Sequence, residues 1–413
     1  MNAHKVAEQA KKASRRISIA STQTKNAVLR SMIGLLEKNK KRLVQANKKD
    51  LALGEKRGLP VNILKRLVFH EAKVESRIQS LKKIIELNDP VGQVGDLEQR
   101  PNGLLVGRMR VPLGVILMIY EARPHVTINA GAFALKSGNC IILKGGKEAA
   151  TCNSLIGKLW KEALLSEELP VDAIQCVTAS YKEIGTLLQL SGYIDLVIPR
   201  GGKRLIRSVA EQSKIPVIKH FEGVCHVYID DQADVDKAER IVLNSKLLMP
   251  EVCNAAETLL VSAAMANDLP RIIQTLQREG IEIRGCNKTK KLVHGIKVAT
   301  EEDWRTEYLD KIYSVKIVKD IEEAINHINI YGSGHTDTIV TENYTRAKKF
   351  LREVDSGVVL VNASTMFDDG EELGMGAEIG ISTDKLHARG PMGLRELTTY
   401  KFIVLGENHI KET

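Results

Sequence analysis

One cysteine of this chain stands in a sequence context that suits a nucleophile. Cys253 lies in the polar, small-residue segment PEVCNAAET, between a predicted helix and an apolar strand. A thiol on such a turn is accessible and can be activated as a thiolate. Free cysteines are more often small core residues, and Cys140, Cys176 and Cys225 lie in strand-like runs that predict burial. From this pattern alone the core interpretation of Cys253 is favoured, and the nucleophile is the alternative.

Two glycine-bearing turns could hold an anion. LKGGK, which contains Lys144, and IPRGGK, which contains Arg200, Gly201 and Gly202, each follow a predicted strand and precede a predicted helix. Glycine pairs let the backbone approach a ligand, and the N-terminus of the next helix favours negative charge. No GxGxxG fingerprint follows a strand, so a dinucleotide here would not use the common phosphate loop. The alternative for each turn is a plain strand–helix connection.

A third polar segment lies near the C-terminus, where HARGPMG spans 387–393. It is too rich in glycine for a helix and too polar for a buried strand. An ordered loop near a site and a surface turn are equally compatible with it.

The elements that must position these residues follow from the apolar pattern. Residues 1–87 show helical spacing, and 88–110 show the glycine and proline punctuation of an extended ribbon. From 111 onward short apolar strands alternate with helices in two successive blocks. This alternation predicts an α/β fold with two doubly wound parallel sheets. A length of 413 residues is compatible with two or three domains.

Charge and composition narrow the class of protein. The net charge is +9, and residues 1–85 alone hold 21 Lys/Arg and 6 Asp/Glu. A nucleic-acid partner is one interpretation, but amphipathic helices with lysine-rich faces are favoured because no nucleic-acid module is recognised. The six cysteines form no CxxC and no metal-ligand spacing, so we expect a reduced compartment and no metal. The polar start and the short apolar runs predict a cytoplasmic protein without membrane contact.

Five segments resemble the γ-glutamyl phosphate reductase family, within the aldehyde dehydrogenase superfamily. They are YEARP, IPRGG, VCNAAETLL, VNAST and GAEIGISTDKLHARGPMGL. The resemblance covers nearly the whole chain and implies an aldehyde-dehydrogenase-like fold. It implies a cofactor-binding domain over 1–95 and 111–225, a catalytic domain over 226–395, and an oligomerisation ribbon over 96–110 and 396–413.

The resemblance also implies an activity. Members of the family reduce L-glutamyl 5-phosphate with NADPH to L-glutamate 5-semialdehyde and phosphate, in the second step of proline synthesis from glutamate. Cys253 would be the nucleophile and would carry a thioester. An aldehyde dehydrogenase acting on another acyl substrate is the alternative. The resemblance implies a homo-oligomer and leaves open whether a glutamate 5-kinase partner passes on the acyl phosphate.

Several site residues follow from the resemblance. Lys144 matches the lysine that meets the adenosine ribose, and Glu307 matches the glutamate that holds the nicotinamide ribose. Arg200, Gly201 and Gly202 match the turn beside the cofactor phosphates. The remaining motifs supply the expected substrate-binding residues, which are Glu121, Arg123, Asn362, Ser364, His387 and Arg389.

The proton chemistry departs from that of hydrolytic aldehyde dehydrogenases. His220 falls where those enzymes carry a glutamate base, which fits an acyl intermediate that meets phosphate or hydride rather than water. A proton shuttle and a merely orienting histidine are both open for His220. Ala122 occupies the position near the superfamily's oxyanion asparagine. The oxyanion would then depend on Asn254 or on backbone N–H groups near Cys253.

Two residues differ from the usual family pattern, and one specificity stays open. Met366 stands where arginine is common, and His125 stands where asparagine is common, which puts binding of the substrate carboxylate or phosphate in question. The preference for NADPH over NADH depends on which cation meets the ribose 2′-phosphate. Lys144, Lys147 and Lys182 are the candidates.

Overall fold

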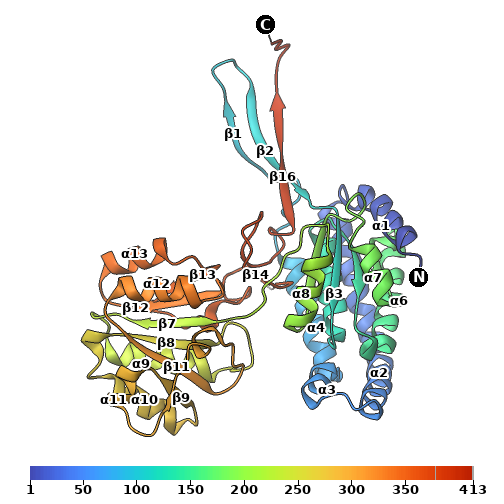
Figure 1. Ribbon diagram of the computed structural model, residues 1–413. Coiled ribbons are helices and arrows are strands. Elements are labelled where there is room, and N and C mark those ends of the chain that lie inside the picture. Colours follow the sequence, from blue (N-terminus) through green and yellow to red (C-terminus); the bar gives the residue numbers. More distant parts are fainter. Residues whose placement is uncertain (377, 412–413) are drawn as a thin grey trace. The chain divides into compact units, whose positions relative to one another are not determined.

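The computed structural model describes residues 1–376 and 378–411, and the chain divides into two compact units (Figure 1). Unit 1 comprises Met1–Lys219, Met375–Gly380 and Met392–Thr413, and unit 2 comprises His220–Gly374 and Ile381–Pro391. The units divide after Lys219, whereas we placed the boundary at 225 and assigned 226–395 to one domain. The glycine-rich C-terminal segment returns to unit 1 twice, and its irregular backbone carries no periodic pattern that would reveal this.

Unit 1 begins with four helices, as the apolar spacing predicts. The buried positions of the long second helix, such as Val28, Met32 and Leu36, recur at intervals of three or four. Its start is capped by Ser21, whose hydroxyl accepts a hydrogen bond from the Thr24 N–H at 3.0 Å. The four helices are α1 (Ala3–Ile17), α2 (Thr22–Lys56), α3 (Val61–Leu67) and α4 (Glu71–Glu86).

The sheet of unit 1 has four parallel strands in the order β5-β4-β3-β6. The chain adds strands on one side of β3 and then returns to its other side, so the switch point lies between β3 and β6. Ligands bind at the carboxyl ends of strands at such a point. The strands are β3 (Val115–Tyr120), β4 (Cys140–Lys144), β5 (Ile174–Cys176) and β6 (Leu196–Arg200), with helices α5 (Pro124–Lys136), α6 (Ala150–Leu165), α7 (Tyr181–Leu187) and α8 (Lys203–Gln212).

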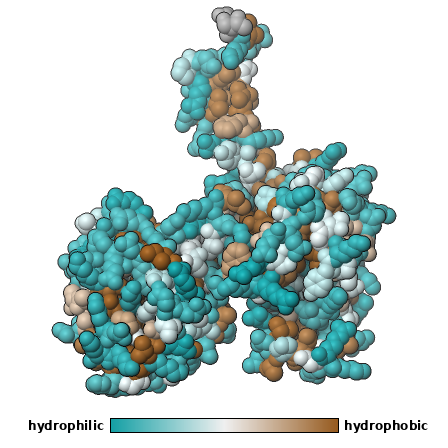
Figure 2. Space-filling model, in the orientation of Figure 1, coloured by the Kyte–Doolittle hydropathy of each residue, from teal (hydrophilic) through white to brown (hydrophobic). Residues whose placement is uncertain are grey.

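A separate antiparallel sheet of three strands also belongs to unit 1. It pairs β1 (Val94–Gln99) with β2 (Leu105–Pro112), and β2 with β16 (Thr398–Leu405). Figure 2 shows apolar residues gathered on this sheet. Its exposed large apolar side chains include Val94, Leu97, Tyr400, Phe402 and Val404.

Unit 2 contains a parallel sheet of seven strands in the order β10-β9-β11-β8-β7-β12-β13. One buried cluster joins α9 and α10 to the sheet, and another joins α12 and α13 to it. The strands are β7 (Cys225–Ile229), β8 (Ala256–Ser262), β9 (Glu282–Gly285), β10 (Lys297–Val298), β11 (Ile312–Val318), β12 (Thr336–Val340) and β13 (Val358–Val361). The helices are α9 (Val235–Leu247), α10 (Leu269–Arg278), α11 (Asn287–Leu292), α12 (Ile321–Tyr331) and α13 (Tyr344–Glu353).

Short elements complete the chain. The two-residue strands β14 (Ile381–Ser382) and β15 (Gly390–Pro391) pair with each other within unit 2. Every helix in the described part of the chain is too short or too polar to cross a bilayer. The 3₁₀ turns are η1 (Lys147–Ala149), η2 (Val171–Ala173), η3 (Ala263–Met265), η4 (Asp303–Arg305) and η5 (Thr365–Phe367).

Candidate active site

The most reactive group of unit 2 lies at the amino edge of its sheet. Cys253 precedes β8 by three residues, and His335 directly precedes β12. His220 lies upstream of β7, which pairs with both of those strands. Because the three strands are parallel neighbours, the segments that lead into them meet at one edge. The fold therefore gathers three residues that are far apart in the sequence.

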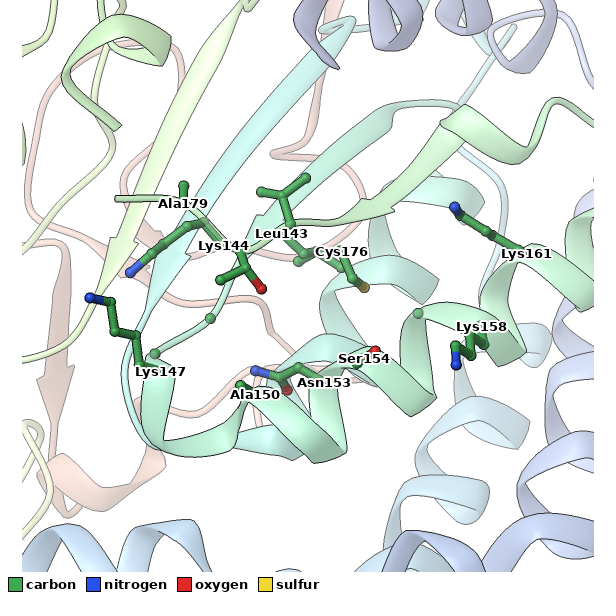
Figure 3. A pocket seen from close by; sticks show the side chains of 15 residues that line it. Leu143, Lys144, Lys147, Ala150, Asn153, Ser154, Lys158, Lys161, Cys176 and Ala179 are labelled. Carbon is green, nitrogen blue, oxygen red and sulfur yellow. The ribbon is translucent and has the colours of Figure 1, made fainter. Parts of the chain in front are cut away.

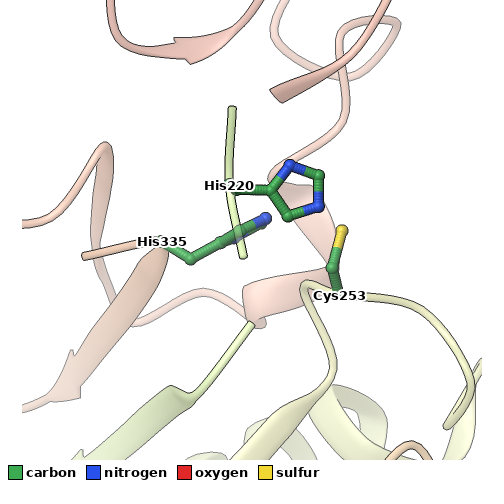
Figure 4. Close-up of side chains that lie close together, drawn as sticks. All are labelled: His220, Cys253 and His335. Atoms are coloured by element: carbon green, nitrogen blue, oxygen red, sulfur yellow. The ribbon is translucent and has the colours of Figure 1, made fainter. Parts of the chain in front are cut away.

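The three side chains face one another (Figure 4). One donor atom from each of Cys253, His220 and His335 lies within 4.8 Å of the other two. The imidazole rings of His220 and His335 meet edge to face, with their centroids 5.5 Å apart. The structure thus places His220 beside the cysteine. His335 was not predicted, and only its place directly before an apolar strand could have indicated it.

His335 is fixed from behind by polar groups. The ring is buried, and its Nδ1 lies 2.7 Å from Thr336 Oγ1 and 3.3 Å from Asp368 Oδ2. The Thr336 hydroxyl in turn donates to the Asp368 carboxylate. Nε2, the ring nitrogen on the other side, has no hydrogen-bond partner among the residues that the structure describes. The ring is therefore held by Nδ1 and presents Nε2 to the site.

The electrostatics favour a thiolate at Cys253. Burial opposes the charge, but the interactions of the sulfur with the neighbouring imidazoles of His335 and His220 outweigh burial and hold the pKa of Cys253 well below its usual range. Burial likewise opposes a charged His335, yet the Cys253 and Cys225 sulfurs and Asp368 hold its pKa well above its usual range. By contrast, burial raises the pKa of Cys140 to about 12. Both directions favour a thiolate on Cys253 beside a charged imidazole on His335.

A glycine leaves room for the nucleophile. A Cβ atom at Gly223 would lie 1.8 Å from the carbonyl oxygen of Cys253, so any side chain there would displace the cysteine segment. The Gly223 N–H donates to Glu307 Oε1 at 2.8 Å. Burial raises the pKa of Glu307, and the hydrogen bond from Gly223 partly offsets that effect. Glu307, which the resemblance assigns to the cofactor, thus holds the loop that packs on Cys253.

Asn254 has a different task from the one we expected. Its amide Nδ2 donates to the Asp368 carbonyl oxygen at 3.0 Å and lies 3.5 Å from the Met366 carbonyl oxygen. These bonds turn the side-chain donor toward the turn that carries Asp368, away from a role as an oxyanion donor. Met366 is itself buried in η5. We propose that the backbone N–H groups near Cys253 hold the oxyanion.

The turn after β6 in unit 1 is organised by a carboxylate. Glu121 Oε2 accepts a hydrogen bond from the Gly202 N–H at 2.9 Å, and a Cβ atom at Gly201 would lie 2.4 Å from the same oxygen. The Glu121 N–H also donates to the Arg200 carbonyl oxygen at 3.2 Å. Glu121 thus ties the end of β3 to the predicted cofactor turn, and its contact with substrate stays a prediction.

Unit 1 also holds a cavity of about 200 Å³, which is lined by the segments that follow β4 and β5 and by residues of α6, several of them lysines (Figure 3). Lys144 ends β4 at its mouth, and the glycines that follow keep the entrance open. A Cβ atom at Gly145 would lie 2.2 Å from Asn153 Nδ2, and one at Gly146 would lie 1.9 Å from Glu148 Oε1. The polar side chains of the lining are Lys144, Lys147, Asn153, Ser154, Lys158, Lys161 and Thr178.

A second cavity of about 420 Å³ in unit 1 shares Lys144, Gly146 and Lys147 with the first and is largely apolar. A cationic pocket beside an apolar one, with a glycine turn at their junction, suits a ligand with phosphates at one end and a planar base at the other. These residues therefore fit a dinucleotide cofactor. The apolar lining consists of Leu59, Ile63, Ile119, Ile184, Leu188, Leu205 and Val209.

A group of cations surrounds the start of α5. Burial, together with the charges of Arg77, Arg123, Lys73 and Arg200, lowers the pKa of His125 to about 3. His125 is therefore neutral, while Arg123 caps α5 at a helix N-terminus that favours anions. The neighbouring cations and the helix N-terminus both favour an anion here, and Arg123 stays our proposed anion-binding residue.

The other predicted substrate residues mostly bond to the protein itself. Asn362 exchanges two hydrogen bonds with the Thr341 backbone, each of 2.9 Å. Ser364 is buried, and its hydroxyl lies 3.1 Å from Ser245 Oγ. Arg389 donates to the Asp355 carboxylate at 2.7 Å, and His387 lies exposed on the loop between β14 and β15. These contacts help to hold the fold of unit 2, and substrate binding by Asn362, Ser364, His387 and Arg389 stays a prediction.

Comparison with known proteins places this site in a family. A model of the aldehyde dehydrogenase family matches residues 1–279 and 299–403. The chain belongs to the aldehyde dehydrogenase family. Within this family, it is 50% identical over 408 residues to a γ-glutamyl phosphate reductase from Desulfatibacillum aliphaticivorans, covering 98% of each chain. A γ-glutamyl phosphate reductase from Caldanaerobacter subterraneus is 47% identical over 98% of this chain and 99% of the relative.

A solved structure gives the same result for this aldehyde dehydrogenase family member. The crystal structure of γ-glutamyl phosphate reductase from Thermotoga maritima is 42% identical and covers both chains completely, with a TM-score of 0.97. The chain thus belongs to the γ-glutamyl phosphate reductases of the aldehyde dehydrogenase family, and the expected fold class is confirmed.

Proposed function

We propose that this protein reduces L-glutamyl 5-phosphate to L-glutamate 5-semialdehyde and phosphate with NADPH, the second step of proline biosynthesis from glutamate. The observation that carries the proposal is the clustering of the Cys253 sulfur with one imidazole nitrogen each of His220 and His335 within 4.8 Å, in a chain whose full-length relatives are named for this reaction. The pKa directions of Cys253 and His335 favour a thiolate there. An acyl phosphate is an electrophile that such a thiolate attacks without further activation.

The first step forms a bond between Cys253 Sγ and the acyl carbon. The tetrahedral oxyanion accepts hydrogen bonds from backbone N–H groups near Cys253. The bond from the acyl carbon to the phosphate oxygen then breaks, and phosphate leaves with the electron pair. Cys253 is left as a thioester. Because phosphate leaves as an anion, this step needs no general acid.

The second step converts the thioester to an aldehyde. When bound, NADPH supplies the hydride that reduces the thioester carbon. Hydride addition leaves a tetrahedral alkoxide, which takes a proton from His220 to become the thiohemiacetal and returns it to His220. The carbon–sulfur bond then breaks, its electron pair stays on sulfur, and the semialdehyde and the Cys253 thiolate are released. His335 stabilises that thiolate, and His220 is placed to move the proton. Unchanged turnover in the His220→Ala variant would exclude the shuttle and leave His220 an orienting residue.

We assign the NADPH preference to the lysine-lined cavity of unit 1. Lys144 and Lys147 line both cavities, and Lys158 and Lys161 line the smaller one alone. A ribose 2′-phosphate at their junction would meet several cations, whereas the ribose hydroxyl of NADH would gain little from them. Lys182 does not belong to either lining. The Lys147→Ala variant should therefore lose affinity for adenosine 2′,5′-bisphosphate about tenfold and keep its affinity for adenosine 5′-monophosphate, by calorimetry.

We also propose that the chain is a homo-oligomer joined through the sheet β1-β2-β16. The exposed aromatic and aliphatic side chains of that sheet, such as Phe402 at 62% exposure, are costly in water and suit an interface. A Phe402→Glu, Val404→Glu double variant should have a smaller mass in light scattering. A glutamate 5-kinase partner stays a prediction from the resemblance.

The alternative is an aldehyde dehydrogenase of another acyl substrate, and one assay separates the two. In the reverse direction, glutamate 5-semialdehyde and NADP⁺ should give NADPH in sustained turnover only when phosphate is present. Sustained turnover without phosphate would contradict acyl-phosphate chemistry, as would phosphate-dependent turnover of unrelated aldehydes at a similar rate.

A further inference from the structure

We propose that Cys253, His220 and His335 form a binding site for Zn²⁺, and that Zn²⁺ bound there reversibly inhibits the enzyme. Zinc binding follows from the three ligands alone, and the inhibition rests on the proposed function of Cys253 as nucleophile. The cysteine spacing of the sequence predicts no metal site, because the ligands come from three separate segments that only the sheet brings together.

The donor atoms are those that Zn²⁺ prefers. One cysteine sulfur and two imidazole nitrogens lie within 4.8 Å of one another. In a tetrahedral zinc site, bond lengths of about 2.3 Å to sulfur and about 2.0–2.1 Å to nitrogen place neighbouring ligand atoms about 3.3–3.6 Å apart. Each pair therefore has to close by about 1.5 Å at most, a change within reach of side-chain rotation.

Both histidines already have the outer contacts of zinc ligands. A ligating imidazole usually donates its other N–H to a carboxylate or a backbone carbonyl, which fixes the tautomer. His335 Nδ1 faces the Asp368 carboxylate at 3.3 Å, and His220 Nδ1 lies 3.1 Å from the Ile381 carbonyl oxygen. A carbonyl oxygen can only accept, so His220 Nδ1 carries the proton and Nε2 keeps its lone pair.

A further observation is that one buried ring nitrogen of His335 lacks a hydrogen-bond partner. His335 is fully buried, and its Nε2 has no hydrogen-bond partner among the described residues. A buried polar atom without a partner is costly unless it serves a ligand or a reaction. Figure 4 shows the His335 ring directed toward the other two side chains. Cys253 and His220 are only half-buried, so the fourth position on the metal is left for water.

Bound Zn²⁺ would stop catalysis by occupying the sulfur. The Cys253 thiolate donates its electron pair to the metal, so it cannot attack an acyl carbon. No bond within the protein changes and no electrons are transferred. A chelator that removes Zn²⁺ should therefore restore full activity.

The test measures metal binding and inhibition separately. We expect one equivalent of Zn²⁺ per chain by competition with a chromophoric chelator. Co²⁺ in its place should give a thiolate-to-cobalt charge-transfer band in the near ultraviolet. Removing one ligand, in Cys253→Ala or His335→Ala, should weaken binding at least about 100-fold. Cys286→Ala is the matched control, because Cys286 is another half-buried thiol of unit 2, and it should bind Zn²⁺ like the parent protein.

Three results would overturn the proposal. They are the absence of the charge-transfer band, unchanged Zn²⁺ affinity in Cys253→Ala, and unchanged affinity in both His335→Ala and His220→Ala. His220→Ala is included because the His220 side chain is only half-buried. Its removal should therefore leave the fold intact, and circular dichroism checks this. Zinc that binds at Cys253 but leaves the reverse reaction unaffected would overturn the inhibition. These measurements of binding need no substrate, so they are independent of whether the acyl donor is glutamyl phosphate.

Discussion

The two parallel sheets of this protein place their functional side chains at opposite edges. In unit 1, Lys144 and Arg200 end their strands, and Glu121 follows the end of β3. In unit 2, Cys253 and His335 come before β8 and β12. The first arrangement is the usual one for ligand binding in such sheets, and the second is its reverse.

The difference has a physical reason. At the carboxyl edge of a parallel sheet the helices begin, and their free N–H groups favour an anionic cofactor without any charged side chain. At the amino edge the helices end, and their C-termini carry the opposite partial charge. An anion there needs an explicit cation. In unit 2 that cation is His335, and Asp368 and Thr336 hold it in place.

The largest effect should come from removing the nucleophile. Cys253→Ser should lower turnover at least about 10⁴-fold, since the serine hydroxyl is far less acidic than the thiol. Cofactor binding, measured by fluorescence quenching, should persist because the residues that we assign to the cofactor do not include Cys253. Cys286→Ser should behave like the parent enzyme. Substantial turnover in Cys253→Ser would contradict the claim that the nucleophile lies at the amino edge of the sheet of unit 2.

A glycine substitution tests how closely the amino edge is packed. In Gly223→Ala the new Cβ would meet the Cys253 carbonyl oxygen at 1.8 Å, and backbone cannot yield as a side chain can. We expect kcat/KM to fall about 10²–10³-fold, because a displacement near 1 Å has this effect on a reacting group. Gly34→Ala is the control, since its Cβ would meet nothing within 4 Å. Equal activities of the two variants would contradict the account.

Removing the cation should have a smaller but diagnostic effect. His335→Ala should lower kcat/KM about 10²-fold, and it should change the pH dependence of Cys253 alkylation by iodoacetamide. In the parent enzyme the pKa of Cys253 is lowered, so Cys253 stays a thiolate at pH values well below those at which an ordinary thiol ionises. Alkylation should therefore stay fast at these pH values and slow only as the pH falls through the lowered pKa.

Burial raises the pKa of Cys253, and His335 counteracts this effect. Without His335 the pKa of Cys253 should therefore rise, and alkylation near neutral pH should slow. Asp368→Asn should shift the profile in the same direction by less. An unchanged pH profile in His335→Ala would show that His220 alone stabilises the thiolate.

The smallest effect is expected at the carboxyl edge. In Gly201→Ala the new Cβ would meet Glu121 Oε2 at 2.4 Å, but a carboxylate on a flexible side chain can move aside. We expect KM for the cofactor to rise about threefold to tenfold, with kcat little changed. A loss of kcat as large as that of Gly223→Ala would show that the two edges are equally rigid.

The sequence predicts the fold more completely than the site. The alternation of strands and helices predicts both sheets, because buried parallel strands are apolar throughout and bounded by glycine or proline. The turns at Lys144 and Arg200 are recognisable for the same reason, since ligand binding at carboxyl edges is a general rule. The return of residues 375–380 to unit 1 leaves no such pattern.

The site at the amino edge depends on contacts between distant segments. His335 and Asp368 are 82 and 115 residues from Cys253, and no spacing rule joins them. Asn362, Ser364 and Arg389 lie in motifs that carry the resemblance, yet they bond to Thr341, Ser245 and Asp355.

The central claim is that Cys253 carries the acyl group, and one measurement tests it most directly. The enzyme is mixed with glutamate 5-semialdehyde and NADP⁺ without phosphate, and the products are followed by absorbance and by mass spectrometry of the digested chain. We predict a burst of about one NADPH per chain, with the mass of a glutamyl group added to the peptide that contains Cys253. Phosphate should then release it. A burst without any label on that peptide, or a label on another residue, would contradict the account.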